Sequence, residues 1–574
     1  MPNLRMGRVG AAAATGTGSD RPGPGETGLM PPTHVVTNTV DPLVGFDAAA
    51  ADPALTAGLA AAGTGPTAEL RTLAVDAGSA EWIEHARLAD AHPPVLHTHD
   101  RAGRRVDEVE YHPSWHALLT RAVATGLQAA PWAPDAGVHA HLHRAAGFYL
   151  WTQTDSGQMC PLSMTYAAVP ALRHDPALAA EFEPGLRARA YDFGLRPAAA
   201  KAGLLAGMSM TEKQGGSDVR AISTVAVPAG PAGEYRLTGH KWFTSAPMND
   251  VFLTLAQAPG GVTCFVVPRV LPDGNRNAVA LVRLKDKLGN RSNASAELEY
   301  DSAFARRLGD EGRGVATILE MVTMTRLDCV LGSAGQIRAG LSQAAFYSAG
   351  RHAFGRPLVD HAPMTAVLAD LAVESWAATL TALRLAGLVD ASTGGSAPAA
   401  ALLRIALPAA KFWICKRAVP VLAEALECLG GNGYLETFPM ARLLRESPLN
   451  GIWEGSGTVT ALDAVRAWQR NPDSADALLA ELDTAAGGHP AFDAGRGALR
   501  ALLHQPPDPA AARRLCSLTA RTVAAGLLIR HAPAEVADLY CATRLGGIGE
   551  RVFGELPAGS PTRAIVDAVT PRTD

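Results

Sequence analysis

The feature that most constrains the fold is a change in hydrophobic period between Gly207 and Tyr300. In this interval, short runs of Val, Phe, Tyr, Trp and Thr are separated by turn signals such as Ala258-Pro-Gly-Gly and Pro272-Asp-Gly, which is typical of antiparallel strands. On either side, apolar residues recur every three or four positions, as they do on amphipathic helices. The order predicts an α+β protein, mostly α, with five to seven strands between two helical regions.

Each expected element is bounded by such a shift in pattern. The predicted strands cover 234–245, 251–257, 262–268, 279–283 and 295–301. The predicted helices cover 81–92, 113–129 and 138–156 before the strands, and 315–351, 363–391, 399–430 and 458–469 after them. No repeat of fixed period is visible, so a solenoid is not expected.

These patterns divide the chain into five segments. They are a disordered leader at 1–33, an N-terminal helical domain at 34–206, a β domain at 207–309, a helical bundle at 310–470 and an extra C-terminal helical module at 471–574. No stretch approaches the ~20 apolar residues of a bilayer span, so no membrane partner is expected. The seven cysteines are scattered without a CxxC pair, which argues against a disulfide framework and favours the cytoplasm.

The segment 208–218 reads Met-Ser-Met-Thr-Glu-Lys-Gln-Gly-Gly-Ser-Asp. Gly215 and Gly216 allow a ligand to approach the backbone, and Thr211 and Ser217 place hydroxyls beside them. Such a loop can hold the edge of a flat heterocycle or a pyrophosphate, or it can be a polar loop capped by Ser217. It has neither the Rossmann nor the Walker A glycine spacing.

An aromatic pair lies in the strand predicted at 234–245. Trp242 and Phe243 are a candidate wall for an aromatic cofactor, with Thr244 as a hydrogen-bond donor. Taken alone, such a pair is more often ordinary core.

Two further segments suit phosphate. Arg351 is a bidentate donor, or else a surface Arg at a helix end. Gly430, Gly431 and Gly433 follow a long predicted helix and form a turn that can receive phosphates or simply end that helix.

Glu454 lies between Trp453 and a Gly-Ser-Gly turn that leads into a predicted helix. A carboxylate beside an indole and away from water should have a raised pKa, which suits a general base near neutral pH. The alternative is an acidic residue in the first turn of a helix, stabilised by the helix dipole.

These segments, in this order and spacing, resemble the acyl-CoA dehydrogenase family of flavoproteins from about Thr33 to Arg466. Two of them, at 211–218 and 452–457, together with Lys-Asp-Lys-Leu-Gly-Asn-Arg-Ser-Asn-Ala at 285–294 and the extra C-terminal module, resemble the AidB branch, the bacterial alkylation-response members. The resemblance implies an N-terminal helical domain, a β domain and a four-helix bundle, with FAD between the last two and homotetrameric assembly.

The resemblance also implies the cofactor contacts. Residues expected around the flavin are Met208, Met210, Thr211, Gly215, Gly216, Ser217, Trp242, Phe243, Thr244, Ile452, Trp453, Gly455, Ser456 and Gly457. Residues expected to reach the FAD of a neighbouring subunit are Arg351, Phe354, Gly430, Gly431 and Gly433. Glu454 takes the position of the family's usual base, which removes the α-proton of an acyl thioester while hydride passes to flavin N5. The electron acceptor is unknown.

Several positions depart from the family pattern. Some members carry the base on an earlier helix, where this chain has Thr325. Thr323 replaces an Asp that helps to hold the CoA tail, although Arg326 remains as a candidate substrate contact. Trp453 replaces a smaller Tyr, and Glu427 replaces a Gln near the flavin diphosphate. These changes predict weak turnover of ordinary acyl-CoA esters.

In the AidB branch the C-terminal module is associated with double-stranded DNA, which gives a second hypothesis: a flavin-containing protein that protects DNA. From Ala464 to Asp574, however, twelve Arg balance twelve acidic residues, whereas DNA binding needs clustered cations. The candidate DNA contacts are Arg466, Arg513, Arg514 and Arg521.

Two weaker motifs are interpreted as structural. His139, His141 and His143 have i, i+2 spacing, which separates the rings on a helix, so no metal site is expected. Cys428, beside the glycine cluster, is expected to be a buried thiol.

Overall fold

The computed structural model describes residues 33–231, 233–506, 508–548 and 552–573. The leader predicted at 1–33 therefore lies outside the described residues, apart from its last position. The chain divides into two compact units, Met1–Thr39 and Val40–Asp574, and the architecture below is that of the second.

Seven helices form most of the N-terminal region. They are α1 (Pro53–Ala61), α2 (Ala68–Ala77), α3 (Ala80–Ala91), α4 (Pro113–Ala124), α5 (Ala140–Thr152), α6 (Met159–Leu172) and α7 (Pro176–Arg187). Side-chain oxygens of Asp52, Thr67 and Ser79 accept N-terminal N–H groups of α1, α2 and α3, which fixes where these helices begin. One feature was not predicted: β1 (Val95–His99) and β2 (Arg105–Glu110) form an antiparallel hairpin inside this region.

The β domain contains a seven-stranded sheet. Its strands are β3 (Ala206–Ser209), β4 (Val225–Pro228), β5 (Glu234–Ser245), β6 (Val251–Ala258), β7 (Gly261–Pro268), β8 (Val279–Leu284) and β9 (Ser295–Leu308). The order is β3-β6-β4-β5-β9-β7, with β8 on β9, and an added β6–β7 pairing joins the path back on itself. The predicted five to seven strands are present, but β3 and β4 pair with β6 in parallel, so the domain is not wholly antiparallel.

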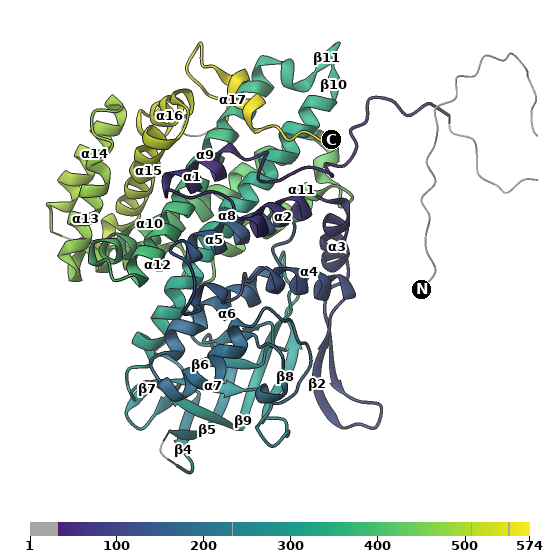
Figure 1. The fold of residues 1–574 in the computed structure, drawn as a ribbon, viewed down its shortest axis with the longest axis vertical. Helices are drawn as coiled ribbons and strands as arrows, with labels where there is room; N and C mark the ends of the chain where they lie inside the picture. Colours follow the sequence, from purple (N-terminus) through teal and green to yellow (C-terminus); the bar gives the residue numbers. More distant parts are fainter. Residues whose placement is uncertain (1–32, 232, 507, 549–551, 574) are drawn as a thin grey trace, which may run out of the picture. The chain divides into compact units, whose positions relative to one another are not determined.

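Long helices build the bundle. They are α8 (Gly314–Gly350), α9 (Ala362–Thr393) and α10 (Ala397–Cys428), followed by α11 (Pro439–Glu446) and α12 (Gly457–Arg470). A two-residue hairpin, β10 (His352–Ala353) and β11 (Arg356–Pro357), joins α8 to α9. Helices α9 and α10 are long and apolar enough to cross a bilayer, yet 89% and 72% of their most apolar windows are buried in protein, as in core helices. Figure 1 shows the sheet below this bundle.

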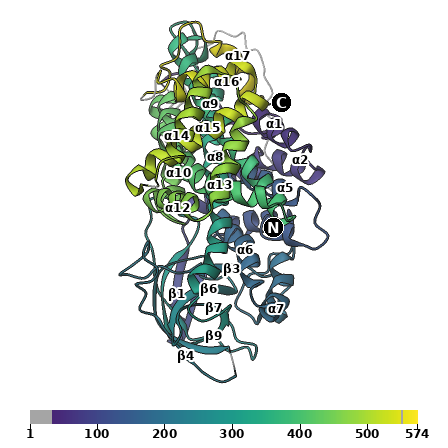
Figure 2. The same cartoon turned by 90° about the vertical axis from the view of Figure 1, so that its left-hand side faces the viewer.

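The C-terminal module adds α13 (Pro472–Asp483), α14 (Pro490–Leu503), α15 (Ala512–His531), α16 (Ala534–Tyr540) and α17 (Thr562–Val569). Helix α15 packs on α9, α10 and α12, so the module covers one side of the bundle, as Figures 1 and 2 show. The predicted order of N-terminal helices, β domain, helical bundle and extra C-terminal helices is thus present.

Buried charges join the module to the bundle. Arg544, in the π-helical turn Cys541–Leu545, donates to Glu374 at 2.6 Å and to Asp370 at 2.5 Å, both on α9. Arg417 of α10 donates to the same Glu374 oxygen at 2.8 Å. Burial raises the pKa of Glu374, but the two guanidinium groups outweigh it and hold that pKa at about 2. We call Asp370, Glu374, Arg417 and Arg544 the module seam.

Candidate active site

Glu454 lies in a tight turn between α11 and α12. Its φ is +57° and that of Gly455 is +99°, so two successive residues are left-handed. Left-handed backbone disfavours an L residue by roughly 1–2 kcal/mol, and it persists only where surrounding contacts hold it. The side chains that do so come from α8 and α10.

Three side chains contact the turn. On α8, the Thr325 hydroxyl donates to Glu454 Oε2 at 2.7 Å, and Arg326 Nε donates to the Glu454 carbonyl oxygen at 2.9 Å. On α10, Lys411 Nζ donates to the carbonyls of Asn450 at 3.0 Å and Gly455 at 2.9 Å. The Glu454 carboxylate is therefore oriented by a neutral hydroxyl, while both cations donate to backbone.

The electrostatics keep Glu454 easy to protonate. Burial raises its pKa, and the Thr325 hydrogen bond and the charges of Lys411 and Arg326 lower it without cancelling the effect. The net direction is upward, as predicted from the sequence. The indole of Trp453 is fixed by its N–H, which donates to Asn450 Oδ1 at 3.0 Å.

The loop at 208–217 lies against the strand that carries the aromatic pair. Trp242 N–H donates to the Thr211 carbonyl at 2.8 Å, which joins these two predicted parts of the site. Inside the loop, Glu212 and Gly215 exchange backbone hydrogen bonds. Met208 and Met210 pack against the apolar core around α6.

A buried ion pair anchors this loop, and we did not predict it. The Glu212 carboxylate accepts from Lys241 Nζ at 2.8 Å and from Thr224 at 2.6 Å, and both members of the pair are 1% exposed. Burial raises the pKa of Glu212, but these donors hold it well below its usual range. The signal available in the sequence was a carboxylate inside a motif otherwise made of small polar residues.

Two apolar side chains of the predicted flavin site are partly exposed to solvent. Phe243 is 49% exposed and Ile452 is 63% exposed, and the Lys285 ammonium lies 3.0 Å from the Trp242 ring centroid. The Thr244 hydroxyl is buried and bonded to Ser209 Oγ at 2.6 Å. Its contact with the cofactor stays a prediction.

The glycine cluster has two kinds of member. A side chain at Gly430 or Gly431 would meet nothing within 4 Å, whereas one at Gly433 would collide with the Leu426 carbonyl. The first two leave an open surface, and Gly433 serves close packing on α10.

Phe354, at the tip of the β10–β11 hairpin with φ +51°, is 96% exposed, and Arg351 immediately precedes that hairpin.

The start of α12 is polar and uncapped. Ser456 occupies the N-cap position but its side chain makes no capping hydrogen bond. The end of the Lys416 side chain lies close beside Gly457, where a larger residue would displace it. Backbone N–H groups and a cation therefore meet at the predicted flavin segment.

Other candidate residues have structural partners. Arg326 is 7% exposed and also donates to Asp463 at 2.6 Å, so its guanidinium is bonded within the protein through Nε and Nη1. Arg521 donates to the Arg544 carbonyl at 2.8 Å and lies over the Trp413 ring, which turns it away from a DNA-facing role. Arg466, Arg513 and Arg514 are exposed.

The structural interpretations of the weaker motifs are supported. His141 is buried against the Tyr166 hydroxyl at 2.6 Å, and burial lowers its pKa to about 4. All seven cysteines are buried free thiols, and burial raises the pKa of Cys428 to about 12.

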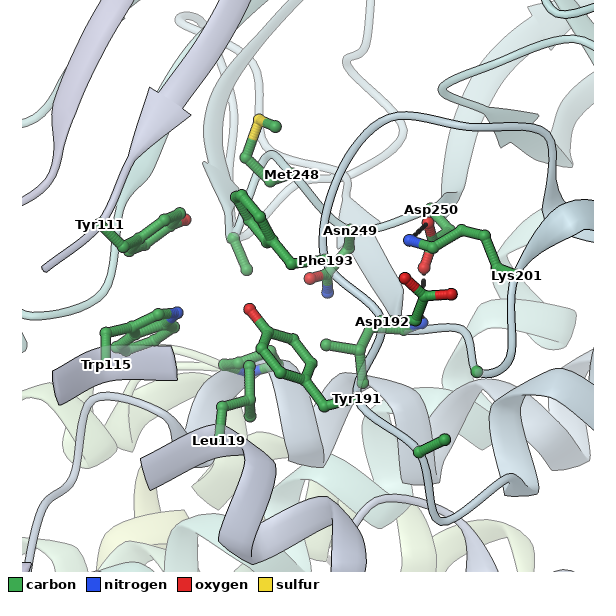
Figure 3. A pocket seen from close by; sticks show the side chains of 15 residues that line it. Tyr111, Trp115, Leu119, Tyr191, Asp192, Phe193, Lys201, Met248, Asn249 and Asp250 are labelled. Atoms are coloured by element: carbon green, nitrogen blue, oxygen red, sulfur yellow. Dashed lines mark hydrogen bonds and ion pairs between the residues drawn. The ribbon is translucent and has the colours of Figure 1, made fainter. Parts of the chain in front are cut away.

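One pocket contains no predicted site residue. It is partly open and lies between the N-terminal helices and the β domain (Figure 3). Aromatic residues Tyr111, Trp115, Tyr191 and Phe193 line it, with the buried ion pair Lys201–Asp250 at one side. Lys201 and Asp250 are paired with each other, and the second carboxylate of the lining, Asp192, is paired with Arg196.

Comparison with known families covers most of the chain. The AidB N-terminal domain of adaptive response proteins matches residues 38–193, the acyl-CoA dehydrogenase middle domain matches 207–303, and the acyl-CoA dehydrogenase C-terminal domain matches 312–468. AidB of Escherichia coli (strain K12) is 43% identical over 478 residues, which cover 83% of this chain and 88% of that protein. The chain belongs to the acyl-CoA dehydrogenase family, in its AidB branch.

Two further relatives carry information on structure and ligand. Acyl-CoA dehydrogenase family member 11 of Caenorhabditis elegans is 35% identical over 67% of this chain and 64% of that protein. The crystal structure of C. elegans ACDH-11 in complex with C11-CoA superimposes with a TM-score of 0.81 at 29% identity, covering 89% and 94% of the two chains. Members of this family bind FAD. The Bacillus anthracis acyl-CoA dehydrogenase complexed with FAD shares the fold, with a TM-score of 0.61 at 16% identity over 80% and 88% of the chains.

Proposed function

We propose that this AidB-like protein is an FAD-dependent oxidoreductase that acts on the CH–CH bond of an acyl thioester, with Glu454 as the base. The observation that carries this proposal is the Glu454 turn. A half-buried carboxylate is fixed in a left-handed turn, oriented by one hydroxyl, and has a raised pKa. That combination suits proton abstraction near neutral pH.

The residues present fit FAD. Phe243 and Ile452 leave apolar surface for a flat ring, and Trp242 and Trp453 flank them in sequence. Ser456 and the glycines at 430 and 431 leave polar backbone uncovered for a diphosphate. The remaining predicted contacts are Thr211, Gly215, Gly216 and Ser217 in the adjoining loop. When bound, FAD supplies two-electron oxidation of the substrate.

The chain's own part in the reaction centres on two groups of Glu454. Its carboxylate accepts the α-proton of the thioester. Its backbone N–H makes no hydrogen bond in the described part of the chain, so it can donate to the thioester oxygen and stabilise the charge that develops there. Arg326 is a positioning residue here, since it holds the Glu454 carbonyl and does not face outward.

Binding of an acyl-CoA is supported by the C11-CoA complex of the C. elegans relative. We propose slow turnover of ordinary esters, because Trp453 adds bulk before the base and Thr323 cannot supply the carboxylate found at that position in typical members. Thr323 instead donates to the Leu319 carbonyl of its own helix at 2.9 Å.

The deciding experiment is an anaerobic titration of the FAD-loaded protein with short, branched and C11 acyl-CoAs, followed by visible absorbance. Exchange of the substrate α-hydrogen with D₂O is measured in parallel. We expect loss of the oxidised-flavin band and α-exchange with at least one ester, both abolished in Glu454→Gln. An unchanged band and no exchange across the panel would contradict the proposal.

We further propose a cytoplasmic homotetramer in which Phe354 reaches a neighbouring subunit. A fully exposed Phe at a hairpin tip is unusual unless a partner covers it, and Tyr434 is also 82% exposed. Phe354→Asp should lower the mass measured by sedimentation, whereas an unchanged mass would contradict this assembly.

DNA protection stays a weaker alternative, because Arg521 has an internal role and Arg530 pairs with Glu481 at 2.9 Å.

A further inference from the structure

Lys411 is a buried ammonium with an unusual set of partners. It lies in the middle of α10, is 2% exposed, and bonds only the two backbone carbonyls of Asn450 and Gly455. Across the residues that the structure describes, no carboxylate lies within ion-pair distance of it. A buried charge without a counter-charge is expensive, so the site must gain something from keeping it.

The two carbonyls bracket Glu454. One belongs to the residue four positions before it and the other to the residue immediately after it. Arg326 takes the carbonyl of Glu454 itself. Three carbonyl oxygens of one turn thus point at two cations, which fixes the left-handed backbone and orients the Glu454 side chain toward Thr325.

The two cations are not equivalent. Arg326 is neutralised by Asp463 at 2.6 Å, and Asp463 is shared with Arg404 at 2.8 Å. The other titratable groups near Glu454 are Cys160 and Cys329, whose buried thiols stay neutral because burial raises their pKa. Lys411 is therefore the positive charge at this turn that has no carboxylate of its own.

We infer that Lys411 is a positioning residue: it clamps the Glu454 turn through two carbonyls and supplies the buried positive charge that balances an ionised Glu454. This inference rests on the proposed role of Glu454 as base. The group that favours the ionised form of Glu454 is then a side chain of α10, whereas Thr325 and Arg326 lie on α8.

The test compares Lys411→Met with Lys411→Arg in the FAD-loaded protein. Infrared difference spectroscopy follows the C=O stretch of the protonated Glu454 carboxyl against pH, and Glu454→Gln identifies the band. We expect Lys411→Met to move the titration midpoint upward by at least about one pH unit, a tenfold change, and Lys411→Arg to restore it. Lys201→Met, which removes an equally buried ammonium paired with Asp250 elsewhere, should leave the midpoint unchanged.

An unchanged midpoint in Lys411→Met would overturn the inference, as would an equal shift in Lys201→Met. If Lys411→Met does not fold, Lys411→Gln keeps a donor for the carbonyls, loses the charge, and gives the same contrast. The readout needs no substrate, so a failure of the proposed reaction, seen as absent α-exchange in the wild type, is distinguished from a failure of the role assigned to Lys411.

Discussion

The Glu454 turn and the module seam are both buried meetings of carboxylates with cations, yet their chemistry is opposite. At the seam, Glu374 accepts directly from the guanidinium groups of Arg417 and Arg544, and its pKa is held at about 2. At the turn, Lys411 and Arg326 donate to carbonyl oxygens, the carboxylate receives one hydroxyl, and its pKa is raised.

The difference lies in what the donors bind, since Glu374 is the more deeply buried carboxylate and yet has the lower pKa. A guanidinium bonded to a carboxylate stabilises the ion more than burial destabilises it, which leaves an inert structural anion. A cation that donates its hydrogen bonds to backbone carbonyls stabilises the carboxylate only through long-range electrostatics. The effect of burial is then larger, and the pKa of the carboxyl rises. A Glu surrounded by Lys and Arg therefore forms a structural ion pair at the module seam and a candidate base at the Glu454 turn.

The largest expected effect comes from removing the base. Glu454→Gln should lower α-hydrogen exchange by about 100- to 10,000-fold, the usual contribution of a general base. Because a raised folded pKa stabilises the protein only below that pKa, losing this carboxyl should leave stability at pH 7 equal or higher. Exchange kinetics and calorimetry check the two parts, and a clearly destabilised variant would contradict the second.

The next effect breaks the seam. Arg544→Met leaves Asp370 without its ion-pair partner and leaves Glu374 with Arg417 alone, and loss of one member of a buried ion pair costs about 3–5 kcal/mol. Hydrogen exchange should show faster opening of α15 and of the turn at 541–545. The Glu454 infrared titration should not move, and a shift there would mean that the two regions are coupled.

Low pH should weaken the module seam through protonation of Glu374. The pKa of Glu374 is depressed, so its stabilising contribution is present above its ordinary value of 4.5 and is lost as pH falls toward 2. Asp370, whose pKa is raised by burial, contributes with the opposite sign and softens the loss. Calorimetry between pH 6 and 2.5 should show a steeper fall in the wild type than in Glu374→Gln, and parallel curves would contradict this account.

The smallest expected effect is at Thr325. Thr325→Val removes the hydroxyl that lowers the pKa of Glu454, so that pKa should rise further, and exchange at pH 7 should fall by up to about tenfold. Thr317→Val, a buried hydroxyl near the start of the same helix that donates within its own turn, is the matched control. An equal fall in exchange in both variants would contradict the role of the Thr325 hydroxyl in setting the pKa of Glu454.

Much of the fold could be predicted because its signals are local. The strand predicted at 234–245 is β5 with the same bounds, and the helix predicted at 315–351 is α8 within one residue at each end. The β1–β2 hairpin was missed because its strands have only five and six residues, β1 has no buried side chain, and β2 buries only Asp107 and Val109. Strands β3 and β4 have four residues each; β3 depends on parallel pairing with distant β6, whereas β4 pairs along its length with β5 and touches β6 at a single residue pair.

The site could be predicted only in part, for a similar reason. Glu454 stood out because it lies beside an indole and a glycine turn. Lys411 did not, because it lies in an apolar helix and its partners are backbone atoms about forty positions away, which carry no residue signature. The burial of Thr244 was not predicted, because a strand residue one position from an exposed Phe can still point inward.

The Thr325 hydrogen bond also bears on how such a site can change over evolutionary time. Some family members place their base where this chain has Thr325, and here that hydroxyl lies 2.7 Å from the Glu454 carboxylate. A chain with Glu at both positions would crowd two carboxylates that must share a proton, and a chain with neither would have no base. The two placements are therefore mutually exclusive, and a lineage can pass from one to the other only through an intermediate impaired in this chemistry.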